Sequence, residues 1–404
     1  MPSSMNEVAD STAAARAGSV IMASVSRIAH RCARRLYDPV MCRARARPGP
    51  GGLMPETMLA VRKQRAAPGL DLVRGHPVPD PAPDEVLIGV SFAGICGTDR
   101  HIYDWDPWSQ GRIRPPVTIG HEFVGSVVAV GSGVRRVRPG ARVSGEGHIG
   151  CGSCQPCRTG RGHICEHVEM VGLDRDGTFA QYLVLPEDNV WVVDESVPDV
   201  VAAVMDPLGN AIHTVMAAGV SGRSVLVTGV GVIGLMAVAV ARSAGAGRII
   251  AVDREPRHLE RALAMGADVA LDANGPDWAD EARRVTNGQG PEVWLEMSGA
   301  APAIGAGLRA LRNGGTVALL GLPQRPVEVD LAEGIIFKGA TVLGISGRRM
   351  YESWYQMEGF LAGSSLGIES LVTHVLPVER FDEGFSLLAS GEAVKVLLEL
   401  GEAR

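Results

Sequence analysis

The sequence lacks the features that mark membrane and nucleic-acid-binding proteins. No uninterrupted apolar run reaches the roughly 18 residues that a transmembrane helix needs. The body of the chain has no long basic run, and the formal net charge is −6. The hydrophobic fraction of 46% and the charged fraction of 21% are those of an ordinary globular protein. We therefore expect neither a membrane nor a nucleic acid as a partner.

The sequence also lacks the spread of cysteines that a disulfide framework needs. Two of its seven cysteines lie near the start, and the other five gather in two short stretches: Cys96, Cys151, Cys154, Cys157 and Cys165. Clustered cysteines favour metal ligation in a reducing compartment. We therefore expect a cytoplasmic protein.

The 404 residues suggest two domains preceded by an unusual leader. The first fifty-odd residues are rich in arginine, alanine and serine, and a GPGG break at 49–52 ends them. Their composition resembles a mitochondrial transit peptide. The alternative, which we favour, is that translation starts later, at Met54 or Met58. We interpret residues 1–57 as a disordered or artefactual leader and leave them out of the fold.

A first set of metal-ligand types lies between residues 96 and 122. Cys96 is followed by a Gly-His-Glu turn that contains His121 and Glu122. Three protein ligands leave a fourth position open, which is typical of a catalytic zinc site. The plainer alternative is a buried cysteine with an incidental surface His-Glu pair.

A second set is the run of four cysteines at 151, 154, 157 and 165. Tight turns at Gly152 and Pro156 let successive sulfurs converge on one ion at about 2.3 Å. With all four positions filled by thiolates, the site is structural, and we place its lobe at residues 145–166. An iron–sulfur cluster uses similar ligands, but the ligand pattern favours zinc.

A glycine-rich turn follows in the second half of the chain. An apolar strand at 223–228 leads into GVGVIG at 229–234, then a helix, then a strand that ends at Asp253. This order is the dinucleotide fingerprint, with roles for Gly229, Gly231 and Gly234 in turning, approach and packing. An acid at Asp253 favours NAD over NADP, because it would repel a 2′-phosphate. Arg254 beside it could partly offset that repulsion.

The pattern of elements predicts an α/β protein with two domains. Short strands with glycine and proline punctuation, such as 58–62, 85–92 and 117–130, predict a β-rich, barrel-like first domain. Strands at 292–295, 315–320 and 341–345 read as buried and alternate with helices such as 303–311, which predicts a doubly wound parallel sheet. We assign 58–206 to the catalytic zinc domain, 207–347 to the cofactor domain and 348–404 to a return to the catalytic domain.

From Met58 onward the chain resembles the zinc-dependent medium-chain dehydrogenases, most closely their L-threonine-oxidising members. The shared segments are CGTDRHIYDWDPWSQ (96–110), VSGEGHIGCGSC (143–154), MDPLGNAIHT (205–214), LEMSGAAPA (295–303) and GRRMYESWYQM (347–357). The resemblance implies a GroES-like catalytic domain, a Rossmann cofactor domain and two zinc ions per chain. It implies oxidation of the L-threonine β-hydroxyl to L-2-amino-3-oxobutanoate by hydride transfer to NAD.

The resemblance also assigns roles. Thr98 and His101 would relay the hydroxyl proton by way of the nicotinamide ribose, and Asp206 would ligate zinc or serve this relay. Candidate substrate contacts are Trp108, Glu146 and His148. Residues at cofactor-contacting positions are Gly229, Gly231, Ile233, Gly234, Asp253, His258, Leu320, Gly321, Leu322, Ile345 and Ser346. Two of these depart from relatives, which often have arginine at 258 and tyrosine at 346.

Other interpretations remain open. A polyol, butanediol or aminocyclitol dehydrogenase would share the metals and the cofactor. A non-catalytic module with this fold would be marked by loss of Cys96, His121 or Thr98, and none is lost. The strand at 341–345, at the expected sheet edge, could pair with its mate in another subunit, and the family resemblance implies a homotetramer.

Overall fold

The computed structural model describes residues 54–275, 277–363 and 365–401. Most of the predicted leader lies outside these residues, and the first strand already begins at Thr57. Among the residues described, no helix is long and apolar enough to cross a membrane.

The strands are β1 Thr57–Lys63, β2 Asp71–Pro77, β3 Glu85–Gly94, β4 Val117–Thr118, β5 Glu122–Val130, β6 Arg142–Gly145, β7 His148–Ile149, β8 Glu169–Met170, β9 Tyr182–Pro186, β10 Val190–Val192, β11 Ser224–Thr228, β12 Arg248–Asp253, β13 Val269–Asp272, β14 Val293–Glu296, β15 Thr316–Leu319, β16 Thr341–Gly344, β17 Val372–Pro377 and β18 Lys395–Glu399. The helices are α2 Gly97–Asp104, α3 Pro107–Arg112, α4 Gln155–Arg158, α5 Asp199–Ala202, α6 Met205–Ala218, α7 Val232–Ser243, α8 Pro256–Ala264, α9 Trp278–Arg284, α10 Ala301–Ala310, α11 Glu352–Gly363 and α12 Phe381–Ala389, with short 3-10 turns and the π-helix η4 Ala332–Ile336.

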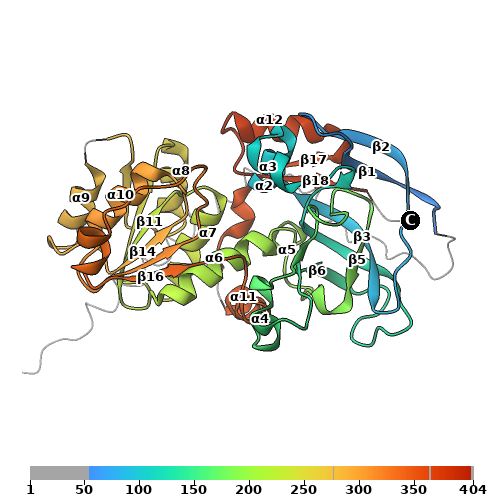
Figure 1. Ribbon diagram of the computed structural model, residues 1–404, viewed down its shortest axis with the longest axis horizontal. Coiled ribbons are helices and arrows are strands. Elements are labelled where there is room, and N and C mark those ends of the chain that lie inside the picture. The colour runs from blue at the N-terminus through green and yellow to red at the C-terminus, as the bar shows by residue number, and fades with distance from the viewer. Residues whose placement is uncertain (1–53, 276, 364, 402–404) are drawn as a thin grey trace, which may run out of the picture. The chain divides into compact units, whose positions relative to one another are not determined.

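The first half of the chain forms a largely antiparallel β structure (Figure 1). Its main sheet has the order β10-β6-β5-β3-β18-β17, with β9 also paired to β3. Apolar side chains from β3, β5 and β18 meet in one core that includes Ile88, Phe123 and Leu398. Strand β18 lies antiparallel to β3, with Leu398 opposite Ala93. The chain therefore returns to its first sheet after the intervening elements.

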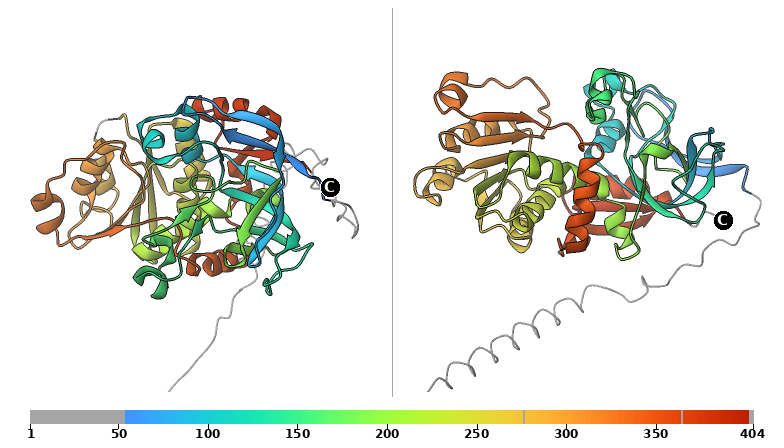
Figure 2. Two further views of the ribbon diagram at one scale, coloured as in Figure 1. Left: turned by 45° about the vertical axis from the view of Figure 1, so that its right-hand side comes forward. Right: turned by 90° about the horizontal axis from the view of Figure 1, so that it is seen from below.

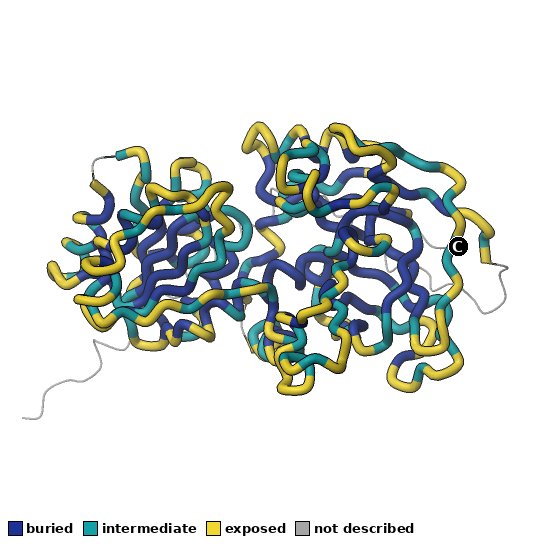
Figure 3. The backbone as a smooth tube through the Cα atoms, in the orientation of Figure 1, coloured by how far each residue is buried: buried dark blue, intermediate teal, exposed yellow. Residues whose placement is uncertain are grey.

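The intervening elements form a six-stranded parallel sheet with the order β13-β12-β11-β14-β15-β16. Successive side chains of β11 enter different cores: Val225 and Val227 pack with α6 and α7, whereas Leu226 packs with α9 and α10. This alternation requires helices on both faces, as Figures 1 and 2 show. The sheet is doubly wound, with buried central strands (Figure 3).

Strand β16 differs from the prediction. The apolar segment 341–345 was expected to be a buried strand at the edge of the sheet. The edge position is confirmed, because among the described strands β16 pairs with β15 alone. The burial is not, since three of the four residues of β16 are exposed. An apolar run alone does not distinguish a central strand from an edge strand.

Candidate active site and metal centres

Cys96, His121 and Glu122 come together although 24 residues separate the first two. Their ligand atoms all lie within 4.8 Å of one another. Cys96 precedes α2, and its N–H donates to the Asp99 carboxylate at 2.9 Å, so the start of this helix fixes the cysteine. His121 follows Gly120, whose φ of +90° and close contact with Phe179 leave no space for a side chain. Glu122 opens strand β5 rather than lying in the turn.

Glu122 also has a cationic partner. The Lys395 ammonium lies 2.7 Å from Glu122 Oε1, and both side chains are 1% exposed. Burial by itself lowers the pKa of Lys395, but the charges of Glu122 and Cys96 raise it overall. The lysine donates a second bond to the Ile95 carbonyl at 2.8 Å. The buried carboxylate charge is therefore compensated by a buried cation.

A second carboxylate, Asp206, faces the same site from helix α6. Its Oδ1 lies 2.6 Å from an Arg348 nitrogen, whereas its buried Oδ2 has no hydrogen-bond partner. A Cβ built on Gly147 would lie 3.6 Å from His121 Cβ and 3.8 Å from this free oxygen, so Asp206 and His121 flank one small space. Burial raises the pKa of Asp206, against the charges of Arg348 and His121.

Buried polar atoms that lack a hydrogen-bond partner are concentrated around Cys96, His121 and Glu122. Six buried side-chain atoms among the described residues have no hydrogen-bond partner, and four of them belong to this cluster: Asp99 Oδ1, His121 Nδ1, Glu122 Oε2 and Asp206 Oδ2. Glu122 Oε2 has an ion pair with Lys395, and His121 Nδ1 lies 3.9 Å from Asp99 Oδ1. Buried polar groups normally have partners, so this concentration points to an ion. Sulfur, nitrogen and carboxylate oxygen together suit zinc. The residues present therefore fit a catalytic zinc ion.

The four-cysteine lobe is a separate metal centre. All four sulfurs lie within 4.8 Å of one another. Backbone N–H groups point at them: Cys151 N lies 3.3 Å and His167 N 3.2 Å from Cys165 Sγ. Hydrogen bonds from Ser153 and neighbouring backbone groups lower the pKa of Cys151 to about 5, which favours the thiolate form that binds metal. Four thiolates close the coordination shell of zinc, so this centre is of the structural kind.

The predicted relay residues lie on helix α2. Thr98 Oγ1 is 4.0 Å from Cys96 Sγ. His101 follows one turn later, and its side chain is 44% exposed. Trp108 on α3 lies with its ring 5.8 Å from the His101 ring and is itself exposed.

The predicted substrate residues Glu146 and His148 are buried in a polar network. Glu146 accepts bonds from the Arg348 guanidinium, from His148 N at 2.9 Å and from Trp354 Nε1 at 2.8 Å. Both of its oxygens are occupied by partners within the protein, although the sequence made Glu146 a candidate substrate contact. Glu146 pairs with Arg348, which in turn pairs with Asp206.

The glycine-rich turn joins β11 to α7, and the three glycines meet different constraints. Gly229 has a φ of +82°, and a Cβ there would lie 2.7 Å from Ser298. A Cβ on Gly234 would lie 2.1 Å from the Gly229 carbonyl oxygen. Nothing lies within 4 Å of the corresponding position on Gly231. The open side of Gly231 at the start of a helix suits the close approach of a pyrophosphate.

Asp253 ends strand β12 beside this turn. Its carboxylate accepts bonds from Val230 N at 2.8 Å and Glu255 N at 2.9 Å. The His258 ring nitrogen lies 3.3 Å away. Burial raises the pKa of Asp253, but His258 and the backbone donors lower it overall. The acid is thus charged and fixed next to the open glycine.

The other predicted cofactor residues follow neighbouring strands of the same sheet. Ile233 lies in α7, whereas Leu320, Gly321 and Leu322 follow β15, and Ile345 and Ser346 follow β16. The carboxyl ends of parallel strands share one edge, so these residues gather with Gly229 and Asp253. Leu322 is 86% exposed, the most exposed large apolar residue described.

Comparison with known proteins identifies the family. Residues 82–195 match the alcohol dehydrogenase GroES-like domain, and residues 232–363 match the zinc-binding dehydrogenase domain. An L-threonine 3-dehydrogenase of Symbiobacterium thermophilum is 46% identical over 346 residues, covering 85% of this chain and 98% of that one. The chain belongs to the zinc-dependent medium-chain dehydrogenase family.

Other relatives have different names. An L-threonine 3-dehydrogenase of Bacillus licheniformis is 44% identical, covering 85% of this chain and 99% of that one. A putative zinc-binding dehydrogenase of Sinorhizobium meliloti, solved with NADP, is 33% identical with a TM-score of 0.77, covering 85% and 99%. The 2R,3R-butanediol dehydrogenase of Bacillus subtilis is 27% identical with a TM-score of 0.75, covering 85% and 100%.

As a medium-chain dehydrogenase, the protein is an oxidoreductase that uses zinc and a nicotinamide dinucleotide. The predicted family is confirmed, and so is the predicted fold class, a GroES-like β-rich domain with a doubly wound Rossmann sheet.

Sequence reasoning missed two charged residues of this dehydrogenase site, Arg348 and Lys395. Arg348 lies inside the segment 347–357 that carries the resemblance, which is the signal that could have found it.

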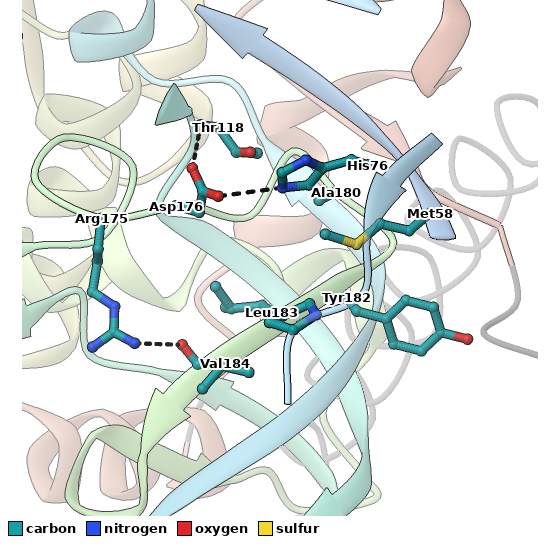
Figure 4. Close-up of a pocket in the computed structure, with 11 residues that line it drawn as sticks. Met58, His76, Thr118, Arg175, Asp176, Ala180, Tyr182, Leu183 and Val184 are labelled. Carbon is teal, nitrogen blue, oxygen red and sulfur yellow. Dashed lines mark hydrogen bonds and ion pairs between the residues drawn. The ribbon is translucent and has the colours of Figure 1, made fainter. Parts of the chain in front are cut away.

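A cavity of about 200 Å³ lies outside these sites, beside β1 and β9 (Figure 4). Asp176 lines it and bonds to the Thr118 backbone N–H at 2.7 Å and to His76 at 3.3 Å. None of the predicted site residues lines this cavity.

Proposed function

We propose that this dehydrogenase oxidises the β-hydroxyl of L-threonine with NAD, giving L-2-amino-3-oxobutanoate and NADH. The observation that carries the proposal is the contrast in similarity. Relatives named L-threonine 3-dehydrogenase reach 42–46% identity over nearly their whole length. The solved butanediol and galactitol-1-phosphate dehydrogenases reach 26–27% over the same extent.

The catalytic zinc domain comprises residues 58–206 and 348–404 in this proposal, and the cofactor domain comprises 207–347. Cys96, His121 and Glu122 hold the catalytic zinc ion, and Cys151, Cys154, Cys157 and Cys165 hold the structural one. The catalytic ion supplies Lewis-acid chemistry that lowers the pKa of the substrate hydroxyl.

The protein's own residues remove the hydroxyl proton. Thr98 accepts it, and His101, one turn further along α2, carries it toward water through its exposed ring edge. Histidine suits this position because imidazole both accepts and releases a proton near neutral pH. The free oxygen of Asp206 is the remaining acceptor in the pocket and serves either the metal or this relay.

Substrate and cofactor are recognised on opposite sides of the reacting carbon. His148 and Trp108 border the substrate side, where a zwitterionic amino acid needs both donors and acceptors. On the cofactor side, Asp253 accepts the adenosine ribose hydroxyls. A 2′-phosphate placed 4 Å from this carboxylate would cost about 4 kcal/mol at an effective dielectric of 20, which favours NAD over NADP.

The deciding experiment measures NADH or NADPH formation by zinc-loaded protein that begins near Met54. L-threonine is compared with D-threonine, L-serine, 2,3-butanediol and sorbitol, each with NAD and with NADP. Preference for L-threonine with NAD is the expected result. A second candidate, a vicinal-diol dehydrogenase, rests on the TM-score of 0.75 to the butanediol enzyme. Turnover of butanediol without turnover of threonine would establish that candidate instead.

We also propose a homotetramer in the cytoplasm. The free edge of β16 and the exposed apolar residues Leu331, Ile336, Phe337 and Val342 offer one contact surface between copies. The four unpaired cysteines of the lobe, of which Cys151 is exposed, favour a reducing compartment. Light scattering on the native protein and the F337D variant tests the assembly, and the variant is expected to form smaller species.

A further inference from the structure

The relay histidine has an acidic partner that the proposed reaction does not yet use. His101 Nδ1 lies 2.6 Å from Asp106 Oδ2. The next acid along the chain, Asp104, faces away from it and pairs with Arg100 at 2.5 Å. Asp106 is thus the carboxylate that contacts the ring of His101.

Three contacts fix the position of Asp106. Helix α2 ends at Trp105 in a left-handed conformation, with a φ of +55°, and the Asp106 N–H bonds back to the His101 carbonyl at 3.3 Å. The Lys63 ammonium sits 4.7 Å above the Trp105 ring and holds this turn. On its other side, Asp106 Oδ1 accepts the Ser109 N–H at 2.9 Å and begins α3 as its N-cap.

This geometry determines which ring nitrogen of His101 is free. A carboxylate accepts hydrogen bonds and donates none, so the proton of a neutral imidazole must sit on Nδ1, facing Asp106. The lone pair is then on Nε2, the nitrogen that can receive a proton. Without the carboxylate, nothing described around the ring selects this tautomer.

We infer that Asp106 is a positioning residue of the proton relay, holding His101 in the tautomer whose Nε2 accepts the substrate proton. This inference rests on the proposed alcohol oxidation. The hydroxyl proton passes from the substrate through Thr98 to Nε2, and the imidazolium keeps its Nδ1–H on Asp106. The Nε2 proton then leaves to water, which restores the starting tautomer.

The test separates this role from helix capping. Serine caps helices about as well as aspartate, so D106S keeps the start of α3 but is too short to reach His101. D104S is the matched control, because it removes an acid two residues away that does not touch His101. We expect kcat of D106S to fall at least about tenfold, which is less than the full 10²–10⁴ that general acid–base catalysis contributes, because His101 is still present. The KM for NAD and the unfolding midpoint stay at native values.

A second readout needs neither turnover nor bound metal. Nitrogen-15 NMR of histidine-labelled protein distinguishes an Nδ1–H from an Nε2–H ring. We expect the Nδ1–H form for His101 in the native protein and in D104S, assigned by comparison with H101N, and loss of this form in D106S. Added imidazole is expected to restore part of the D106S rate by accepting the proton in place of the histidine.

The outcomes decide between the two roles. If D106S matches D104S in kcat, or if its rate falls while the tautomer stays unchanged, the inference is wrong and Asp106 acts only as a cap. Failure of the native protein to oxidise L-threonine would count against the proposed substrate. The NMR comparison would still decide the role of Asp106.

Discussion

The Lys395 ammonium and the Glu122 carboxylate form an ion pair that water does not reach. The pair adjoins Cys96 and His121, and its two partners come from strands that lie on either side of β3. There is no spare space: a Cβ on Gly94 would lie 2.4 Å from Glu122 Oε2 and 3.1 Å from Lys395 Cε. This lysine is therefore the buried cationic partner of a predicted zinc ligand.

Removing Lys395 is expected to destabilise the protein strongly. K395M leaves the buried Glu122 carboxylate without its lysine partner, at a cost of about 3–5 kcal/mol. Urea unfolding of the zinc-loaded protein measures the loss, and K395R, which keeps the charge, is expected to lose less. Equal stability of K395M and the native protein would contradict this account of the site.

Alanine substitutions at two glycines of the nucleotide turn are expected to differ in effect: one lowers the stability of the protein, and the other weakens cofactor binding. An alanine at 234 would meet the Gly229 carbonyl, so G234A should unfold at lower urea. An alanine at 231 faces open space, so G231A should keep its stability within about 1 kcal/mol. It should nevertheless bind NADH about tenfold more weakly, a change of about 1.4 kcal/mol. Urea titration and NADH fluorescence check the pair. Native affinity in G231A would show that no pyrophosphate approaches there.

The four-cysteine lobe is expected to lose its metal independently of the active site. C154S removes one of four thiolates, so metal analysis should find one zinc ion per chain instead of two. The lobe should then become sensitive to proteases, because structural zinc in peptides contributes on the order of 10 kcal/mol. S153A, which removes only a hydrogen bond to Cys151 Sγ, serves as the control. Two retained zinc ions in C154S would exclude this site.

Acid should weaken the buried network around Glu146. Burial alone would raise the pKa of Glu146, but the Arg348 guanidinium holds it well below its ordinary value of 4.5. A lowered carboxyl pKa contributes stability that is complete above pH 4.5 and is lost as the pH falls further. E146Q should therefore cost about 3–5 kcal/mol near pH 7, with a smaller difference below pH 4.5.

Urea unfolding between pH 3 and pH 8 would follow this difference. The control is E352Q, which removes an exposed acid paired with Arg349 and should change little at any pH. A difference between E146Q and the native protein that stays constant down to pH 3 would contradict the lowered pKa.

Local motifs explain how much of the site the sequence could predict. The zinc ligands, the relay residues and the glycine turn lie in short segments whose spacing carries the chemistry. Lys395 carries no such signal, because 273 residues separate it from Glu122 and only strand order brings them together. The amino-acid composition does single out the lysines, because they are rare in this chain. Only three of the 39 lysines and arginines are lysines, and the other two are also held by backbone carbonyls.

The sequence predicted the surroundings of individual side chains less well than it predicted the motifs. Glu146 was expected to face the substrate, but Arg348 and Trp354, from the segment after β16, occupy both of its oxygens. The fragment 143–154 alone could not reveal these partners. Likewise, β16 has the apolar sequence of an interior strand and the position of an edge strand.

The place of β18 in the first sheet has a consequence for synthesis on the ribosome. The metal-ligating segment emerges early, and the whole nucleotide-binding sheet follows before Lys395 is made. Until then, Glu122 has no lysine, and the gap between β3 and β17 has no strand. The order of translation therefore delays completion of the active site until the cofactor domain has been made.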